Sequence, residues 1–330
     1  YIQKDTNNDY VDIAPNDGCG GIGGVKKLGD RLVFFKERCG VYNVLFTGDS
    51  DIPLIVQKSL CSIGSDAGYT IQEGSNSLIF YSRNGFNLYA YDGVACFALS
   101  DKVQPTILGF DEATSTTMIG AIHYPLNQYW LALRASGAST NNRVIVYDFI
   151  NNAFSVHTGI SISFMNVVSK SSEFKIYTGD YTGRVLEQDN GNTDLVAGTA
   201  TAIDSSIKTA WFPLGQPAYF KSVQHLFVFH ALTGNYNISF GYAYDFENTD
   251  RYSEVFSVTS GGTNWDAFAW DDGTKWGSSG GGNVTRIDTT GGGAFVRYHF
   301  SQNASAAAWE IYGITPVFRY EKIHRPIPVS

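Results

Sequence analysis

The stretch Asp30–Gly48, DRLVFFKERCGVYNVLFTG, decides the fold because the chain repeats its pattern at Asn76–Gly93, NSLIFYSRNGFNLYAYDG. Leu32 aligns with Leu78, an offset of 46 residues. Each copy has the pattern of an apolar strand, a short turn that contains glycine, and a second strand that ends at glycine. A repeat of this length that carries strands is typical of one blade of a β-propeller.

Two looser copies follow, and each again has a strand, a polar turn and a second strand. The third occupies 128–134, 143–148 and 153–157, and the fourth occupies 174–177 and 184–187. A sheet with two apolar faces cannot cover both alone, so such units must stack. We expect about four blades of roughly 45 residues within residues 25–190, after an N-terminal segment or partial blade over residues 1–24. Four blades are few for a closed ring, so further blades could precede Tyr1 or come from partner strands.

The polar segment 189–194, DNGNTD, marks a boundary beyond which the strands lengthen and alternate between apolar and polar residues. Strands of this kind pair into antiparallel sheets that place one face in a core. The expected strands are 208–215, 220–229, 236–245, 294–300 and 309–320. The sequence therefore predicts an all-β protein, with β-propeller-like blades followed by a C-terminal antiparallel β-sandwich over residues 191–330.

The composition favours a protein that buries much of its surface. Charged residues make up only 16% of the chain and hydrophobic residues 43%, which fits burial in a core or against other subunits. The net charge of −8 argues against a surface that neutralises DNA phosphates, because such a surface needs clustered Lys and Arg. An acidic wall would instead repel DNA and let it slide. We find no apolar run of about 18 residues, the length that a membrane-spanning helix needs.

All four cysteines lie in the first third of the chain, at Cys19, Cys39, Cys61 and Cys96, and none belongs to a CxxC pair. Two disulfides could form in an oxidising compartment. A chain of this size needs no covalent staples, however, so the sequence favours free, half-buried thiols.

Two motifs in the first 25 residues have the outline of ligand sites. Gly18–Gly23 matches GxGxxG, but no strand precedes it and no helix follows to hold a pyrophosphate, so we interpret it as a loop. Asp5–Asn16 resembles a calcium-binding loop. Tyr10 takes the place of its turn glycine, however, and Asn16 takes the place of its bidentate glutamate. The sequence therefore predicts neither a cofactor nor a metal site.

No arrangement typical of catalysis is visible. The histidines are scattered without HxH or HExxH spacing, and the GxSxG match at Gly277–Gly281 falls in a Gly/Ser-rich stretch that is interpreted as a loop tip. His225 and His230 are five residues apart and would face opposite sides of one strand. Asp271 and Asp272 are interpreted as turn residues, because neighbours on a strand point apart. We therefore predict no catalytic residues and a protein that is not an enzyme.

Six aromatic residues are candidates for an interface or ligand contact: Tyr89, Tyr91, Tyr242, Tyr244, Trp270 and Trp276. The tyrosines form two i, i+2 pairs, and aromatic residues on one face stack on sugars or fill protein interfaces. The alternative for these pairs is cross-strand packing inside the fold. Trp270 directly precedes the segment Asp271–Trp276, and Trp276 ends it. This segment resembles the Asp-box hairpin of sialidase-type propellers, and both tryptophans would pack on the sandwich.

The repeats resemble the tail nozzle proteins of short-tailed bacteriophages, also called tail tubular B or tail stabilisation proteins. Further segments that carry the resemblance are NNRVIVYDFINNAFSVHTG at 141–159, KTAWFPLGQPAYFKSV at 208–223 and AWEIYGITPVFRYE at 308–321. The resemblance covers most of residues 25–322. It implies a virion tail protein, made in the host cytoplasm, that forms a homo-oligomeric ring, often a hexamer, below the portal and adaptor. Such a ring forms a conduit for double-stranded DNA, without sequence-specific binding, until genome ejection.

Two other classes of protein stay open. A glycan-binding propeller of a tail or surface receptor-binding protein would present a concave aromatic cleft with polar partners. A propeller hydrolase would place convergent carboxylates in a sheltered pocket, one of them with a raised pKa.

Overall fold

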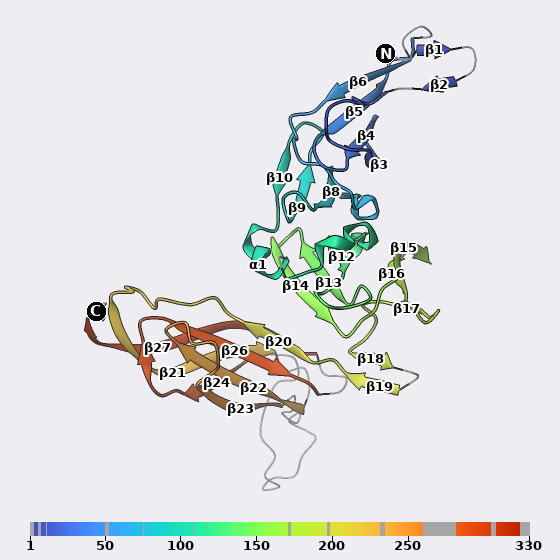
Figure 1. Ribbon diagram of the computed structural model, residues 1–330. Helices are drawn as coiled ribbons and strands as arrows, with labels where there is room; N and C mark the ends of the chain where they lie inside the picture. Colours follow the sequence, from blue (N-terminus) through green and yellow to red (C-terminus); the bar gives the residue numbers. More distant parts are fainter. Residues whose placement is uncertain are drawn as a thin grey trace. The chain divides into compact units, whose positions relative to one another are not determined.

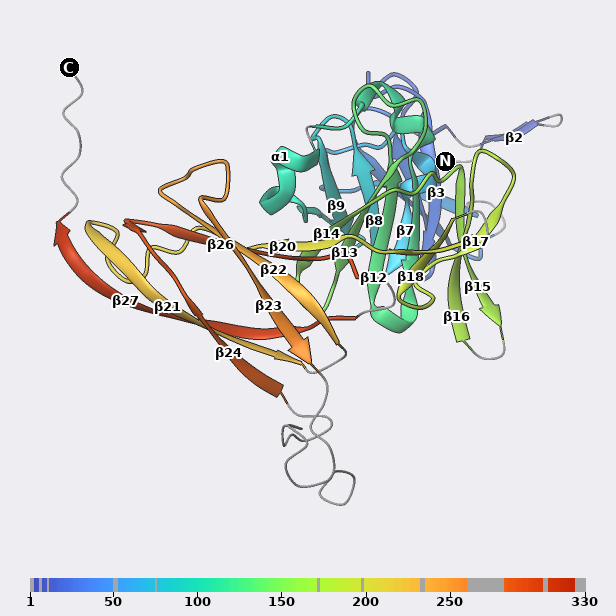
Figure 2. The ribbon, with the colours of Figure 1, turned by 90° about the horizontal axis from the view of Figure 1, so that it is seen from below.

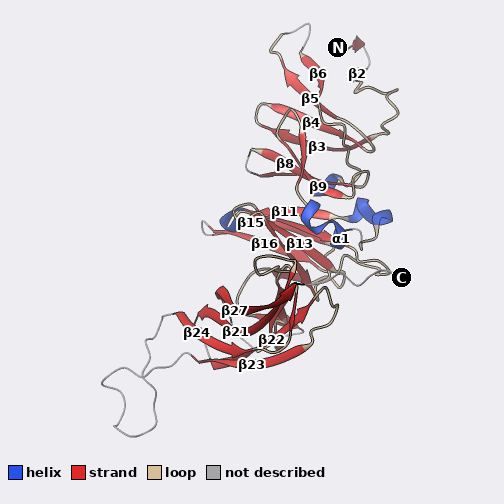
Figure 3. Ribbon diagram, turned by 90° about the vertical axis from the view of Figure 1, so that its left-hand side faces the viewer, coloured by secondary structure: helices blue, strands red, loops and turns tan. Residues whose placement is uncertain are grey.

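A computed structural model describes residues 3–5, 8–10, 12–49, 53–74, 76–107, 109–170, 173–196, 199–231, 235–259, 282–304 and 308–323. The chain divides into two compact units, Tyr1–Asn190 and Gly191–Ser330. In Figure 1 the first unit runs from blue to yellow-green and the second from yellow to red. Antiparallel strands dominate both units, as Figure 3 shows in red, so the all-β prediction is confirmed.

The described residues of the first unit form four larger antiparallel sheets, in each of which strands consecutive in sequence are neighbours. Sheet 1 contains β3 (Ile22–Leu28), β4 (Arg31–Lys36), β5 (Val41–Phe46) and β6 (Leu54–Lys58), and sheet 2 contains β7 (Gln72–Gly74), β8 (Ser77–Ser82), β9 (Asn87–Tyr91) and β10 (Cys96–Ala98). Sheet 3 contains β11 (Ile119–His123), β12 (Gln128–Leu133), β13 (Arg143–Asp148) and β14 (Ala153–Thr158), and sheet 4 contains β15 (Phe164–Lys170), β16 (Glu173–Gly179) and β17 (Val185–Glu187). This up-and-down order is that of propeller blades.

The sequence repeat aligns equivalent strands. Leu32 and Leu78 lie in β4 and β8, the second strands of sheets 1 and 2. The third and fourth copies supply β12 and β16, the second strands of sheets 3 and 4. The prediction of propeller-like blades is therefore confirmed. Sheet 1 begins at Ile22, within the predicted N-terminal segment, and sheet 4 has three described strands.

The sheets pack face to face, because successive side chains of a strand point to opposite faces and one strand can serve two cores. In β8, Leu78 and Phe80 lie in one core with Phe35 of sheet 1, whereas Ile79 lies in a second core with Tyr129 of sheet 3. A third core joins sheets 3 and 4. In Figure 1 the sheets accordingly follow one another in sequence order, from blue through cyan and green to yellow-green. Figure 2 shows the same sheets from below, where they overlap.

Buried tyrosine hydroxyls connect one sheet to the next. Tyr91 donates a hydrogen bond to Asn43 Oδ1 (3.0 Å), and Tyr129 donates one to the Thr70 carbonyl (2.8 Å). A Cβ at Gly120 would lie 2.5 Å from the Tyr129 hydroxyl, so glycine is needed at this close approach. Burial raises the pKa of Tyr129, and the hydroxyl therefore stays protonated and can donate.

Short helical turns connect the sheets of the first unit. They are η1 (Gly68–Thr70), η2 (Asp101–Val103), α1 (Gln104–Ile107), η3 (Glu112–Thr117) and η4 (Tyr124–Leu126). Within the described residues, no helix has the length and apolar character that a membrane span requires. Two small hairpins complete the described strands outside the larger sheets: β1 (Gln3–Asp5) with β2 (Asn8–Tyr10), and β18 (Thr193–Val196) with β19 (Thr199–Ala202).

The second unit is the predicted antiparallel sandwich, and its sheets enclose one apolar core. One sheet has the order β20 (Ser205–Lys208), β26 (Val296–Gln302), β22 (Asn235–Tyr244) and β23 (Tyr252–Thr259). In the other, β21 (Tyr219–Ala231) pairs with β24 (Gly282–Asp288), β25 (Gly292–Gly293) and β27 (Ile311–Ile323). Alternate residues of β21 are buried, which places Leu226 and Val228 in the core.

One predicted strand of the sandwich is wrong. The segment expected at 208–215 contributes only Lys208 to β20, together with an isolated bridge at Phe212. Pro213 has no backbone N–H to donate to a ladder, and Leu214 has a positive φ of 48° that turns the chain. The turn places the Pro213 carbonyl 2.5 Å from the buried Lys221 amine, which also donates to the carbonyl of Ala294 (2.8 Å).

The prediction of free cysteines is also wrong. Cys19 is bonded to Cys39 and Cys61 to Cys96, with Cα–Cα distances of 4.9 and 5.1 Å. Spacing along the chain does not reveal either pair, because both depend on how sheets 1 and 2 place their turns. Cys61 follows the last strand of sheet 1, and Cys96 begins the last strand of sheet 2. The second bond therefore joins two neighbouring sheets.

We expect the double variant Cys61→Ala/Cys96→Ala to lower the free energy of unfolding by about 3 to 4 kcal/mol, because the bond restricts a long loop of the unfolded chain. Urea unfolding under non-reducing conditions measures the difference. Reductant should destabilise the wild type further than this variant, which keeps only the Cys19–Cys39 bond. Equal stability of variant and wild type would contradict the prediction.

Candidate functional site

The structure buries three of the aromatic residues predicted as contacts. Tyr91 lies in the core between sheets 1 and 2, and Tyr242 and Tyr244 lie in the sandwich core. The hydroxyls of Tyr242 and Tyr244 both approach the carbonyl of Thr290, at 3.3 and 3.2 Å. The ligand-contact prediction is therefore wrong for these three residues, and the alternative of packing inside the fold is confirmed. Their i, i+2 spacing places each pair on one face, and that face points inward.

Of the other three aromatic candidates, one is half-buried and two lie outside the described residues. Tyr89 is half-buried, and its ring stacks on that of Phe80, with the ring centroids 5.8 Å apart. Trp270 and Trp276 lie outside the described residues, as does the hairpin predicted at Asp271–Trp276.

The histidines of β21 lie on opposite faces, as predicted. His225 is partly exposed and lies 2.9 Å from Asp288, whereas His230 is buried and contacts the Thr285 hydroxyl. Among the residues that the structure describes, no three His, Cys, Asp or Glu side chains gather as a metal site would require.

A shallow pocket of about 210 Å³ lies between turns of sheets 1 and 2 and is lined by Leu28–Arg31, Glu73, Asn76 and Asp92–Gly93. Asp92 accepts hydrogen bonds from the N–H groups of Val94 and Ala95, both at 2.8 Å. These bonds hold the pKa of Asp92 below its usual value, so its carboxylate is charged at neutral pH and cannot act as a proton donor.

The outward face of sheet 4 is the most distinctive surface of the first unit. Cross-strand register aligns Phe164 with Gly179 and Val185 in one row of this face. Phe164 and Val185 are exposed, whereas the large apolar side chains in the cores between sheets are buried. The face, which we define by its outward side chains, comprises Phe164, Asn166, Val168, Lys175, Tyr177, Gly179, Val185 and Glu187.

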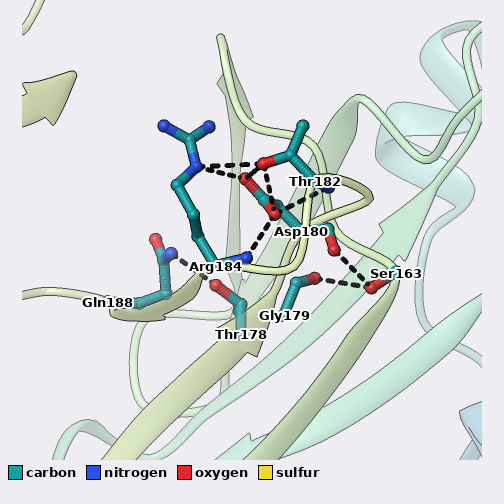
Figure 4. Close-up of polar contacts among 7 residues, drawn as sticks. All are labelled: Ser163, Thr178, Gly179, Asp180, Thr182, Arg184 and Gln188. Atoms are coloured by element: carbon teal, nitrogen blue, oxygen red, sulfur yellow. Dashed lines mark hydrogen bonds and ion pairs between the residues drawn. The ribbon is translucent and has the colours of Figure 1, made fainter. Parts of the chain in front are cut away.

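The turn between β16 and β17 is fixed by Asp180, as Figure 4 shows. Its Oδ1 accepts the N–H groups of Thr182 and Arg184, both at 2.8 Å. Its Oδ2 accepts the Thr182 hydroxyl and the Arg184 Nε, both at 2.7 Å. Ser163 Oγ donates to the Gly179 carbonyl (2.9 Å) and so ties the turn to the start of sheet 4. The many donors hold the pKa of Asp180 far below its usual value, with the backbone N–H of Arg184 as the largest cause.

This arrangement holds the Arg184 guanidinium at the turn that ends β16 and begins β17. The Nε of Arg184 is bonded to Asp180, and Figure 4 shows the two terminal nitrogens pointing away from the cluster. The Asp180 N–H donates to the Arg184 carbonyl, one position beyond the Gly179–Val185 pair, so Arg184 alternates with Val185 and is not part of the outward face. Arg is enriched at protein interfaces, and a pre-ordered guanidinium loses little entropy when a carboxylate or carbonyl binds.

The centre of the outward face carries a compact polar group. Glu187 accepts hydrogen bonds from Lys175 Nζ (2.6 Å) and the Tyr177 hydroxyl (3.1 Å). These bonds raise the pKa of both Lys175 and Tyr177. The group is internally paired, so a partner surface could cover it without leaving an isolated charge. Apolar side chains around a paired polar centre can bind a protein surface.

The sequence predicted two strands of this site, at 174–177 and 184–187, but neither β15 nor the site itself. The apolar residues Phe164, Met165 and Val168, which fall on both faces of β15, were one available signal. The other was Gly179-Asp180-Tyr181-Thr182-Gly183, whose Asp and Gly are typical of a side-chain-capped turn.

Comparisons with known proteins identify no family. No protein-family model matches the chain, and no curated protein matches it. One matching solved structure is a glycoside hydrolase family 43 arabinoxylan arabinofuranohydrolase from Bacillus subtilis, crystallised with cellotetraose. The match is 9% identical, covers 91% of this chain and 78% of that chain, and has a TM-score of 0.23. A score this low supports no conclusion about the fold or activity of this chain.

We expect Asp180→Asn to lower the thermal unfolding temperature at neutral pH, because the amide replaces a charged acceptor of several hydrogen bonds. The pKa of Asp180 lies below its ordinary value of 3.8 in the folded chain. Its stabilisation is therefore fully present above that value and is lost as pH falls further. Thermal scans from pH 7 to pH 3 should show the difference between the wild type and the variant begin to narrow below about pH 4, without reaching zero, because the pKa of Asp180 in the folded chain lies far below its ordinary value.

Asp30→Asn is the matched control, because Asp30 is an exposed turn aspartate beside Arg31. It should leave the unfolding temperature almost unchanged. A difference between wild type and Asp180→Asn that stays constant down to pH 3 would contradict the assignment.

Proposed function

We propose that the chain is a virion structural protein, a subunit of a homo-oligomeric ring in the tail nozzle of a short-tailed bacteriophage. In this role, copies assemble below the portal and adaptor and enclose the conduit that retains and later releases double-stranded DNA. The observation that carries the proposal is the outward face of sheet 4, which exposes Phe164, Val168 and Val185. The family resemblance of the repeats supports the same role.

The placement of the acidic groups also supports a structural role. The pKa values of Asp17, Asp92, Asp148, Asp180 and Asp288 are all lowered. Carboxylates in this state accept hydrogen bonds and fix turns, whereas a general acid needs a raised pKa. We therefore propose that the chain works by shape and charge and not by catalysis.

Net charge fits a conduit that DNA passes without adhering. At −8 the chain carries an excess of acidic side chains, and a wall of that sign repels phosphate. The two disulfides are compatible with a virion, since virion surfaces are among the places where disulfides persist.

Glycan binding is the second candidate, and one surface of the sandwich favours it. Phe246 is exposed and has a positive φ of 66°, a costly backbone conformation for an aromatic residue that recurs at functional sites. Its ring lies 5.0 Å from that of Trp211 and 4.9 Å from that of Phe295. The guanidinium of Arg297 already covers Trp211 at 4.7 Å, which leaves Phe246 as the main exposed ring of the cluster.

The mass of the particle in solution tests the proposed function. Light scattering after size exclusion should give a multiple of the 36.2 kDa chain mass, and negative-stain images should show rings with an open channel. Double-stranded DNA should not be retarded in a gel even at about 50 mM salt, where electrostatic binding is strong. A strict monomer that binds sugars on a glycan array, and loses that binding in Phe246→Ala, would overturn the proposal in favour of glycan binding.

A further inference from the structure

Within the stack, a sheet has a backward face, which packs on the preceding sheet, and a forward face, which packs on the next sheet. In sheet 2, Leu78 and Phe80 point back toward sheet 1, and Ile79 points forward toward sheet 3. The 46-residue repeat makes Leu32 and Phe34 of sheet 1 the equivalents of Leu78 and Phe80. The outward face of sheet 1, which carries Leu32 and Phe34, is therefore a backward face of the kind that covers a preceding sheet.

The equivalent residues differ in burial. Leu78 and Phe80 are both 0% exposed between sheets 1 and 2, whereas Leu32 and Phe34 are only partly buried. On the same face, Val25 of β3 is 51% exposed and Phe46 of β5 is 65% exposed.

The outward face of sheet 1 is continuous across its strands. Register aligns Val25 with Phe34, Leu32 with Val44, and Phe46 with Leu54. Ile13 packs on part of this face, beside Tyr42 and Val44.

The outward face of sheet 4 is the matching forward face. Ile176 of β16 points back into the core shared with sheet 3, so its neighbours Lys175 and Tyr177 point forward. On this face Phe164 is 55% exposed and Val185 is 74% exposed. One chain thus carries an incompletely covered backward face at one end of its stack and an incompletely covered forward face at the other.

We propose that the outward face of sheet 4 in one copy packs on the outward face of sheet 1 in a second copy, and continues between chains the face-to-face packing of sheets 1 to 4. A second copy is the occupant because it supplies a forward face, the type that packs on the backward face in each internal contact. The contact joins two different surfaces, so copies add head to tail and close into a ring when their rotation allows it. This inference names the contact of the proposed assembly and rests on that proposal.

Variants at exposed positions test the contact without disturbing the cores. Val25→Glu/Phe46→Glu places two charges on the outward face of sheet 1, and Phe164→Glu/Val185→Glu places two on that of sheet 4. The control is Val255→Glu, which is 62% exposed on β23 of the sandwich. Light scattering after size exclusion should show assembled wild type and control, and monomeric face variants, with unchanged circular dichroism and unfolding temperatures.

A mixture of the two face variants gives the sharper result. Each variant keeps one intact face, so an equimolar mixture should form a one-to-one complex that grows no further, while each variant alone stays monomeric. Assembly of the wild type that survives both double variants would overturn this inference and leave the proposed ring intact. A wild type that is monomeric at all concentrations would overturn both.

Discussion

The first unit depends on one constraint: its interior sheets, 2 and 3, are apolar on both faces, so each must be covered on both sides. Burying one large apolar side chain is worth about 1.5 to 3 kcal/mol, and Leu78 and Ile79 of a single strand contribute to two different cores. No interior sheet is stable alone. The stacking of the sheets, the tyrosine bonds between them and the character of the two end faces all follow from this requirement.

Much of this architecture could be predicted from the sequence, because a local pattern determines it. The repeat that equates Leu32 with Leu78 was enough to locate the second strands of the blades. The cysteine pairing could not be predicted, since Cys61 and Cys96 meet only through the packing of two sheets. The direction of a same-face pair such as Tyr242 and Tyr244 was equally hidden, because periodicity places two side chains on one face without saying what covers it.

The candidate site was visible only in part for a similar reason. The turn residues around Asp180 could be recognised locally, but the exposure of Phe164 depends on the absence of a following sheet among the described residues of the first unit. Other charged groups form contacts inside the first unit. Lys36, for example, contacts Asp17 at 3.4 Å, and Asp17 accepts the Tyr42 hydroxyl at 2.9 Å. These polar contacts hold the chain of the first unit against its own sheets. The apolar side chains that are free to contact a partner lie at the two ends of the stack.

The two disulfides have a mechanical consequence. If the chain is pulled along its length, tension that reaches Cys61 passes through sulfur to Cys96 and bypasses residues 62–95, which include the strands β7 to β9. The Cys19–Cys39 bond shields β3 and β4 in the same way. Hydrogen bonds in these strands then carry little of the load. Under a steady pull the chain would therefore extend in β5, β6 and the later sheets before it extended in β3, β4 or β7 to β9.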